Sequence, residues 1–338
     1  MSQSRFYSIN TKGKITTLNT ASEVFTNHKN GEFYWLDYYK PTREELTTLI
    51  EPLDLHPLTV EDCTDENLVP KIEEYPNNTF IIFNSYSYIE RELWVDEVDF
   101  IIGKNYLITV SGYNSNGRNP LIGIEKLVER EINQAKLGPS HLLQIILDHV
   151  VDKMFVAIES LEEELDAAEE NLINDPATFV PSETIRLRRH LLTLRKSLFH
   201  EREILVKICR KDCPFISDSA IYHFRDIYDH LSKFFELTET YREIVSSLLE
   251  MNVSMMNNRL TKSANQTNLS VRRLTLISTI FMPLTLLAGI GGMSEWSMMT
   301  NPENWRLSYP FFLLGMIIIG ALNYMFIKWL ERRDKARY

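Results

Sequence analysis

A line of polar, uncharged side chains runs at helical spacing through the last third of this 338-residue chain. Asn257, Thr261, Asn265 and Asn268 follow one another at intervals of four, four and three residues, which places them on one face of a helix. Amide and hydroxyl groups hydrogen-bond to the water around an ion without holding the ion too tightly to release it. The same face continues through Val271, Leu274, Ser278, Met282, Thr285 and Gly289. Several copies of such a helix around one axis would line a path for a hydrated ion; the alternative is the interior of a helical bundle with incidental polar residues.

Two uncharged apolar segments lie near the C-terminus, residues 274–290 and 311–327, with seventeen residues each. This length is at the short end of what a membrane-spanning helix needs. Basic residues flank the pair on its outer sides, whereas the connection 291–308 contains only Arg306. The positive-inside rule therefore predicts a multi-pass protein of the lipid bilayer, with both outer flanks in the cytoplasm and the connection outside.

The charge distribution separates the membrane part from the rest. The net charge is −10, yet residues 259–338 hold ten Lys and Arg against four Asp and Glu. The acidic remainder excludes nucleic acid as the main partner, because phosphate contacts need a basic face. The N-terminal residues contain no apolar run typical of a signal peptide. We therefore expect an inner or plasma membrane protein whose N- and C-termini are both cytoplasmic.

The first 140 residues are predicted to form an α/β domain. Aromatic and β-branched runs that are typical of strands occur at residues 33–39, 80–88, 98–102 and 106–110. Gly103-Lys104-Asn105 predicts a tight hairpin between the last two runs. Thr42, followed three residues later by Glu45, predicts a capped helix start.

Residues 141–268 are predicted to be helical. Apolar residues recur at threes and fours from Leu147 to Leu172, and a second helix is predicted from Ser182, so the two would pair as an antiparallel hairpin. Seven acids and no base lie between Glu159 and Glu170; they form either a solvated helix face or an acidic collar that concentrates cations. Residues 215–282 lack both Gly and Pro, which predicts one helix of roughly 100 Å that runs into the first membrane span.

These patterns predict six consecutive regions. They are a cytoplasmic α/β domain (1–140), a helical hairpin with a long stalk helix (141–268), a pore-lining transmembrane helix (269–291), an external loop (292–308), a second transmembrane helix (309–328) and a basic cytoplasmic tail (329–338).

Several motifs in a fixed order carry a family resemblance. Residues 279–285 read Thr-Ile-Phe-Met-Pro-Leu-Thr, and they are followed by Ala288-Gly289-Ile290 and by Gly292-Met293-Ser294. Earlier motifs stand at 35–37 (Trp-Leu-Asp), 56–62 (His-Pro-Leu-Thr-Val-Glu-Asp), 70–73 (Pro-Lys-Ile-Glu) and 224–230 (Phe-Arg-Asp-Ile-Tyr-Asp-His). With two terminal spans, this set resembles the CorA family of divalent-cation channels, in which the tripeptide is Gly-Met-Asn.

The resemblance implies a homopentameric funnel in which five first spans line one pore and five second spans face lipid. It supports five residues of the helix face described above as pore-lining, namely Asn268, Val271, Leu274, Met282 and Thr285. Leu274 and Met282 would form apolar constrictions that gate by dewetting.

The resemblance also implies that the loop Gly292-Met293-Ser294, with Glu295, holds a hydrated cation at the outer mouth. Ser294 offers a short hydroxyl where the family has the longer amide of Asn. Mg²⁺ sheds its water reluctantly, which suits recognition through first-shell water, but selectivity over Zn²⁺, Co²⁺ or Ni²⁺ stays open. Glu295 and Glu303 are either rings of negative charge or solvated loop acids.

Cytoplasmic Mg²⁺ is sensed in this family where subunits meet. The matching carboxylates here are Glu61 and Asp62 on one subunit and Asp226 on its neighbour. They would repel one another at low Mg²⁺, and a bridging ion would draw the subunits together and close the pore. The alternative is a helix-capping Asp62 and a surface Asp226.

The sequence is compatible with three functions. The leading expectation is a pentameric channel that conducts hydrated Mg²⁺ into the cytoplasm and is gated by cytoplasmic Mg²⁺. The second is a Zn²⁺, Co²⁺ or Ni²⁺ transporter of the same fold, and the third is a non-conducting, membrane-anchored sensor or scaffold. An enzyme is not expected, because the sequence contains no Gly-rich phosphate loop, no nucleophile–His pairing and no metalloprotease motif.

Overall fold

A computed structural model describes residues 4–26, 31–65, 69–113, 119–176, 178–292 and 304–335. The chain divides into two compact units, Met1–Asn252 and Val253–Tyr338, and the boundary falls inside one long helix.

The described part of the first unit contains one seven-stranded sheet of order β2-β1-β3-β7-β6-β5-β4. The strands are β1 Arg5–Asn10, β2 Ile15–Leu18, β3 Glu32–Tyr39, β4 Lys71–Glu74, β5 Asn78–Ile89, β6 Glu92–Gly103 and β7 Tyr106–Ser111. β3 and β7 pair in parallel, and the other neighbours are antiparallel. The predicted strand runs all lie in this sheet, and the predicted hairpin at 103–105 joins β6 to β7.

Short helices cover one face of the sheet. They are α1 Glu23–Thr26, α2 Arg43–Thr47, α3 Ile50–Leu53 and α4 Pro57–Asp62, and their apolar side chains form one core with β3, β5, β6 and β7. The predicted cap is present at the start of α2: the backbone N–H of Glu45 donates to Thr42 Oγ1 at 3.2 Å, and the N–H of Thr42 donates to Glu45 Oε2 at 2.9 Å.

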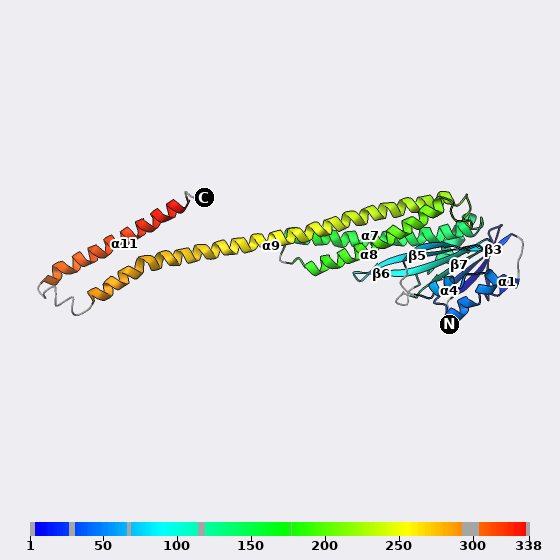
Figure 1. The fold of residues 1–338 in the computed structure, drawn as a ribbon, viewed down its shortest axis with the longest axis horizontal. Helices are drawn as coiled ribbons and strands as arrows, with labels where there is room; N and C mark the ends of the chain where they lie inside the picture. Colours follow the sequence, from blue (N-terminus) through cyan, green and yellow to red (C-terminus); the bar gives the residue numbers. More distant parts are fainter. Residues whose placement is uncertain are drawn as a thin grey trace. The chain divides into compact units, whose positions relative to one another are not determined.

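Long helices form a second layer. After α5 Ile124–Arg130 and α6 Ile132–Ala135 come α7 Pro139–Asn174, α8 Pro181–Cys209 and α9 Ile221–Gly291, and α7, α8 and the first part of α9 lie side by side (Figure 1). The Phe155 and Phe234 rings stack with centroids 5.8 Å apart and join α7 to α9. The Arg202 guanidinium of α8 lies 4.8 Å from the centroid of the Phe235 ring of α9. The predicted helical hairpin and long helix are therefore both present.

The second unit contains the last part of α9 and α11 Trp305–Lys335. In the described part of the chain, two helices are long and apolar enough to cross a membrane, Ile221–Gly291 and Arg306–Trp329. Gly291 allows them to approach closely, since a Cβ there would lie 2.7 Å from Cζ of Phe312. The α/β unit, the long helix and this pair of apolar C-terminal segments confirm the predicted fold class of the single chain.

Candidate functional site

The membrane part of α9 has two faces with different surroundings. Leu276, Ile280, Leu284, Leu287 and Gly291 are partly buried, and Leu284 and Gly291 lie against Gly320 and Phe312 of α11. Residues two positions apart on a helix point about 200° apart. The predicted pore-lining residues therefore lie on the opposite face: Val271, Leu274, Ser278, Met282, Thr285 and Gly289 are all exposed in the single chain.

The exposed face is hollowed where the predicted stripe ends. Met282, Thr285 and Gly289, with Leu286 and Ile290, line a depression of about 560 Å³. Met282 is 71% exposed and Leu274 is 66% exposed. Large apolar side chains that are this exposed are compatible with lipid, a further copy of the helix or a narrow path between copies.

Hydroxyl groups on this helix donate their protons back to its own backbone. Thr285 Oγ1 donates to the carbonyl of Phe281 at 2.8 Å, and Thr261 Oγ1 donates to the carbonyl of Asn257 at 2.9 Å. A hydroxyl used in this way keeps its lone pairs as acceptors. These two hydroxyl groups can therefore still accept hydrogen bonds from water.

The predicted selectivity loop is described only at its first residue. Gly292 follows α9 and donates its N–H to the carbonyl of Ala288 at 3.0 Å. Met293, Ser294 and Glu295 lie outside the described residues, as does Glu303.

Glu61 and Asp62 form the last turn of α4, and Glu61 is exposed. Lys71 of β4 donates to Asp62 Oδ2 at 2.6 Å and to Glu73 Oε1 at 2.9 Å. The helix is capped at its start by His56, whose Nδ1 accepts from the N–H of Leu58. Asp62 is therefore a charged partner of Lys71 and not a helix cap.

Asp226 lies on an exposed position of α9, and its charge acts on an acid of α7, Asp148, that the sequence patterns did not single out. Asp148 is half-buried, and burial raises its pKa to about 6. The negative charges of Asp152 and Asp226 also raise the pKa of Asp148, while His230 lowers it. A half-buried carboxyl beside other carboxylates is the arrangement that a divalent cation stabilises. The signal available in the sequence was an Asp directly after the apolar run Ile145-Ile146-Leu147.

Within the described residues of one chain, no hydrogen bond or ion pair joins Asp226 to Glu61 or Asp62. No group of three or more His, Cys, Asp or Glu side chains in this part of the chain is arranged to hold a metal ion. The three predicted sensor residues thus lie in two separate places, α4 and α9.

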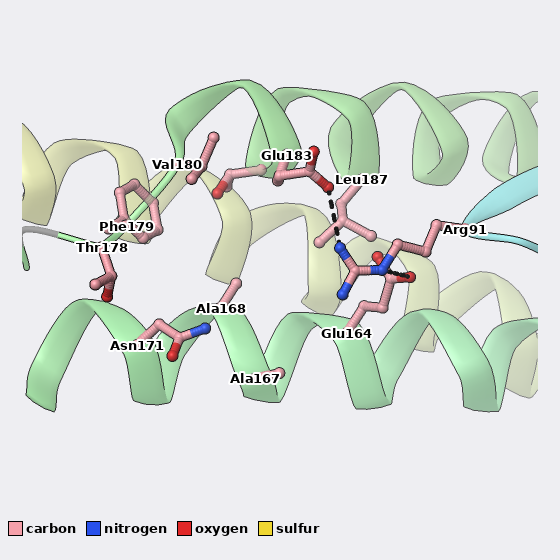
Figure 2. Close-up of a pocket in the computed structure, with 11 residues that line it drawn as sticks. Arg91, Glu164, Ala167, Ala168, Asn171, Thr178, Phe179, Val180, Glu183 and Leu187 are labelled. Atoms are coloured by element: carbon pink, nitrogen blue, oxygen red, sulfur yellow. Dashed lines mark ion pairs between the residues drawn. The ribbon is translucent and has the colours of Figure 1, made fainter. Parts of the chain in front are cut away.

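A pocket at the far end of the α7–α8 hairpin is occupied by its own ion pairs. Figure 2 shows Arg91, from the turn between β5 and β6, reaching toward Glu164 of α7 at 3.5 Å and Glu183 of α8 at 3.7 Å. Arg186 contacts the same two carboxylates at 2.7 and 2.9 Å. The remaining space is about 180 Å³. This arrangement fixes the sheet to the helical hairpin, and it assigns Glu164 of the predicted acidic collar to a structural role.

Comparisons with known proteins connect this geometry to a family. A family profile described as CorA-like Mg²⁺ transporter protein matches residues 30–329. The chain is 33% identical, over 282 residues, to a cobalt/magnesium transport protein of Thermotoga maritima, with 82% of this chain and 77% of the relative covered. It is 24% identical, over 305 residues, to the zinc transport protein ZntB of Photorhabdus laumondii, with 89% and 87% covered.

The fold has a counterpart among solved structures. The complete structure of the CorA magnesium transporter from Methanocaldococcus jannaschii superposes with a TM-score of 0.71 at 22% identity, and the match covers 98% of this chain and 97% of that one.

Proposed function

Because the chain belongs to the CorA-like Mg²⁺ transporter family, and is therefore a divalent-cation transporter and not an enzyme, we propose that it is a channel that conducts hydrated Mg²⁺ into the cytoplasm. The observation that carries this proposal is the division of α9 into two faces. One face packs against α11, and the opposite face presents Ser278, Thr285 and Gly289 between exposed apolar side chains.

The proposed assembly is a homopentamer. Two spans in each chain cannot enclose a water-filled path, whereas several copies of α9 around one axis can. In this arrangement residues 269–291 line the pore, 309–328 face lipid, and 1–268 and 329–338 are cytoplasmic. Leu274 and Met282 then form apolar rings that close by dewetting, and Asn268 and Thr285 accept hydrogen bonds from the water around the ion.

The proposed selectivity loop is Gly292, Met293, Ser294 and Glu295 at the outer mouth. Five Ser294 hydroxyls accept from first-shell water in a wider ring than five amides would form. A second candidate function, transport of Zn²⁺, Co²⁺ or Ni²⁺, is favoured by this serine and by the similarity to a zinc transport protein.

The proposed gate is set by cytoplasmic Mg²⁺. Glu61 and Asp62 of one chain face Asp226 of the next, and Asp148 extends the acidic surface around Asp226. A cation between them replaces repulsion by attraction, so that high cytoplasmic Mg²⁺ favours the closed state. Since Lys71 already neutralises part of the charge of Asp62, we expect Asp226 to contribute more to this site than Asp62.

The test is a flux measurement on the purified protein in liposomes, with Mg²⁺ and Zn²⁺ compared side by side. Mg²⁺ influx that follows the membrane potential and stops at high internal Mg²⁺ supports the proposal. Flux of Zn²⁺ alone supports the second candidate. No flux of either cation from well-folded assemblies supports a non-conducting sensor and rejects transport of Mg²⁺ and of Zn²⁺.

A further inference from the structure

A pocket of about 670 Å³ lies in the first unit, on the sheet face that α7 covers. Its polar side chains are Ser85, Ser87, Asp96, Asn119 and Lys153. Apolar surface comes from α7, from the segment after β7 and from aromatic side chains of the sheet, with Tyr39, Ile122 and Val156 among the lining residues. A volume of several hundred Å³ with a few convergent polar groups is typical of small-molecule sites. None of the residues proposed for conduction or gating lines it.

The accessible charge in this pocket is positive. Asp96 and Lys153 are its only acid and base among the described lining residues. Asp96 is 8% exposed, so it lies beneath the surface, whereas Lys153 is only partly buried. A ligand that enters from solvent therefore meets the ammonium group before the carboxylate.

Among the described residues, the ammonium group of Lys153 has one hydrogen-bond acceptor. It donates to the backbone carbonyl of Pro120, and an ammonium carries three N–H groups. Burial lowers the pKa of Lys153 although Asp96 acts in the opposite direction. The positive charge is thus not fully compensated where it stands, and an additional anionic acceptor would stabilise it.

Apolar side chains stand around the mouth. Ile122 is 71% exposed and Val156 is 60% exposed. A ligand with an apolar body would remove both from water while its charged end reaches Lys153. Ser85 and Ser87 lie two positions apart on β5 and so point to the same face of the sheet. Together with Asn119 they supply further hydrogen-bonding groups that orient the ligand.

We propose that this pocket binds a small organic anion with an aromatic or branched apolar body. Its carboxylate or similar group accepts hydrogen bonds from Lys153, and its apolar body lies against Tyr39, Ile122 and Val156. No residue of this site belongs to the proposed pore or gate, so the binding test is independent of the test of cation transport.

The test uses the full chain in lipid nanodiscs and 4-(trifluoromethyl)phenylacetate as the probe, followed by fluorine NMR. Saturable binding in the millimolar range or tighter is expected, and the neutral amide of the same probe should bind about tenfold or more weakly, as expected for the loss of a charge-assisted hydrogen bond. Equal binding of the amide, or no saturable binding of the carboxylate, overturns the proposal.

Variants locate the site. Lys153→Met should weaken probe binding about tenfold or more, while Lys153→Arg should retain it, and Lys196→Met, at an exposed position of α8, should leave it unchanged. Val156→Trp fills the mouth from an exposed helix position and should abolish binding, with Leu192→Trp as its control. If Lys153→Met does not fold, Val156→Trp decides: undiminished binding in that variant overturns the proposal.

Discussion

The negative charge of Asp226 on α9 helps to raise the pKa of Asp148 on α7, so the two helices meet at this pair of carboxyl groups. Burial is the main reason why the pKa of Asp148 rises to about 6, and the negative charge of Asp226 contributes to the same rise. A divalent cation bound nearby would stabilise the ionised form of Asp148, because it offsets the cost of burial and the repulsion by the charge of Asp226. This pair is therefore the part of the proposed sensor that one chain contributes on its own.

Asp226→Lys should weaken the protection from proteolysis that Mg²⁺ confers on the assembled protein. The lysine places a positive charge where the cation is proposed to bind, so several-fold more Mg²⁺ should be needed for half-protection. The measurement is the rate of limited proteolysis against Mg²⁺ concentration. Asp229→Lys, which changes another exposed acid of the same helix, is the matched control. Unchanged protection in Asp226→Lys would remove this residue from the sensor.

Mild acid should weaken the same protection. Asp148 has a pKa of about 6, so its charge is present at neutral pH and is lost as the pH falls through 6. Since Mg²⁺ competes with the proton for this carboxyl group, more Mg²⁺ should be needed at about pH 5.5 than at about pH 7.5. Asp148→Asn should weaken protection at neutral pH and remove most of this pH dependence. A variant with the full pH dependence of the original chain would assign that dependence to another group.

Met282→Ser should produce a leak. The side chain is 71% exposed on the face of α9 opposite α11, where the proposal places an apolar constriction. A hydroxyl holds water in a ring that methionine keeps dry, so Mg²⁺ flux at high internal Mg²⁺ should rise several-fold. Ile317→Ser, at an apolar position of α11 that is 66% exposed, controls for the introduction of a serine into a span. Equal leaks in the two variants would place Met282 outside the constriction.

Patterns that repeat along one helix were predictable from the sequence. The stripe from Val271 to Gly289 follows from a period of 3.6 residues, and its residues are exposed on one face of α9. The cap at Thr42 was predictable for a similar reason, because its partner Glu45 is three residues away.

Contacts between distant segments were not predictable in this way. The interaction of Asp148 with Asp226 depends on how α7 packs against α9, and the ion pair of Asp62 with Lys71 depends on how α4 meets β4. Periodicity identifies which face of a helix is apolar, but it does not say which other element covers that face. For the same reason the pocket at Lys153 has no signature in the sequence.

Ser294→Asn should shift the ratio of Mg²⁺ to Zn²⁺ flux toward Mg²⁺. An amide has a longer side chain than a hydroxyl, so in the proposed loop its oxygen would reach further toward first-shell water, which Mg²⁺ retains more firmly than softer cations do. The comparison is made in liposomes under one membrane potential, and Ser297→Asn in the same connection serves as the control. A ratio that moves toward Zn²⁺, or does not move, would exclude residue 294 as the selectivity element.

Glu201→Gln should change how stability depends on pH. Glu201 is fully buried on α8, where it accepts from the backbone N–H of Asn84 in β5 at 3.2 Å and from Ser197 Oγ at 3.1 Å. Burial raises its pKa from an ordinary 4.5 to about 8. Between these values the folded chain keeps a proton that the unfolded chain releases, so stability falls by up to roughly 1.4 kcal/mol for each pH unit as the pH rises.

Glutamine, like the protonated acid, has a carbonyl oxygen that accepts and a group that donates, and it does not titrate. The variant should therefore lose less thermal stability than the original chain between about pH 5 and pH 8, and it should unfold at a higher temperature at the upper end of this range. Glu203→Gln, an exposed carboxylate two positions along α8, should keep the original dependence. If the thermal stability of Glu201→Gln falls with pH as steeply as that of the original chain, the buried carboxyl group is not the source of this fall. Glu201 would then be ionised in the folded chain and would accept from the N–H of Asn84 as a carboxylate.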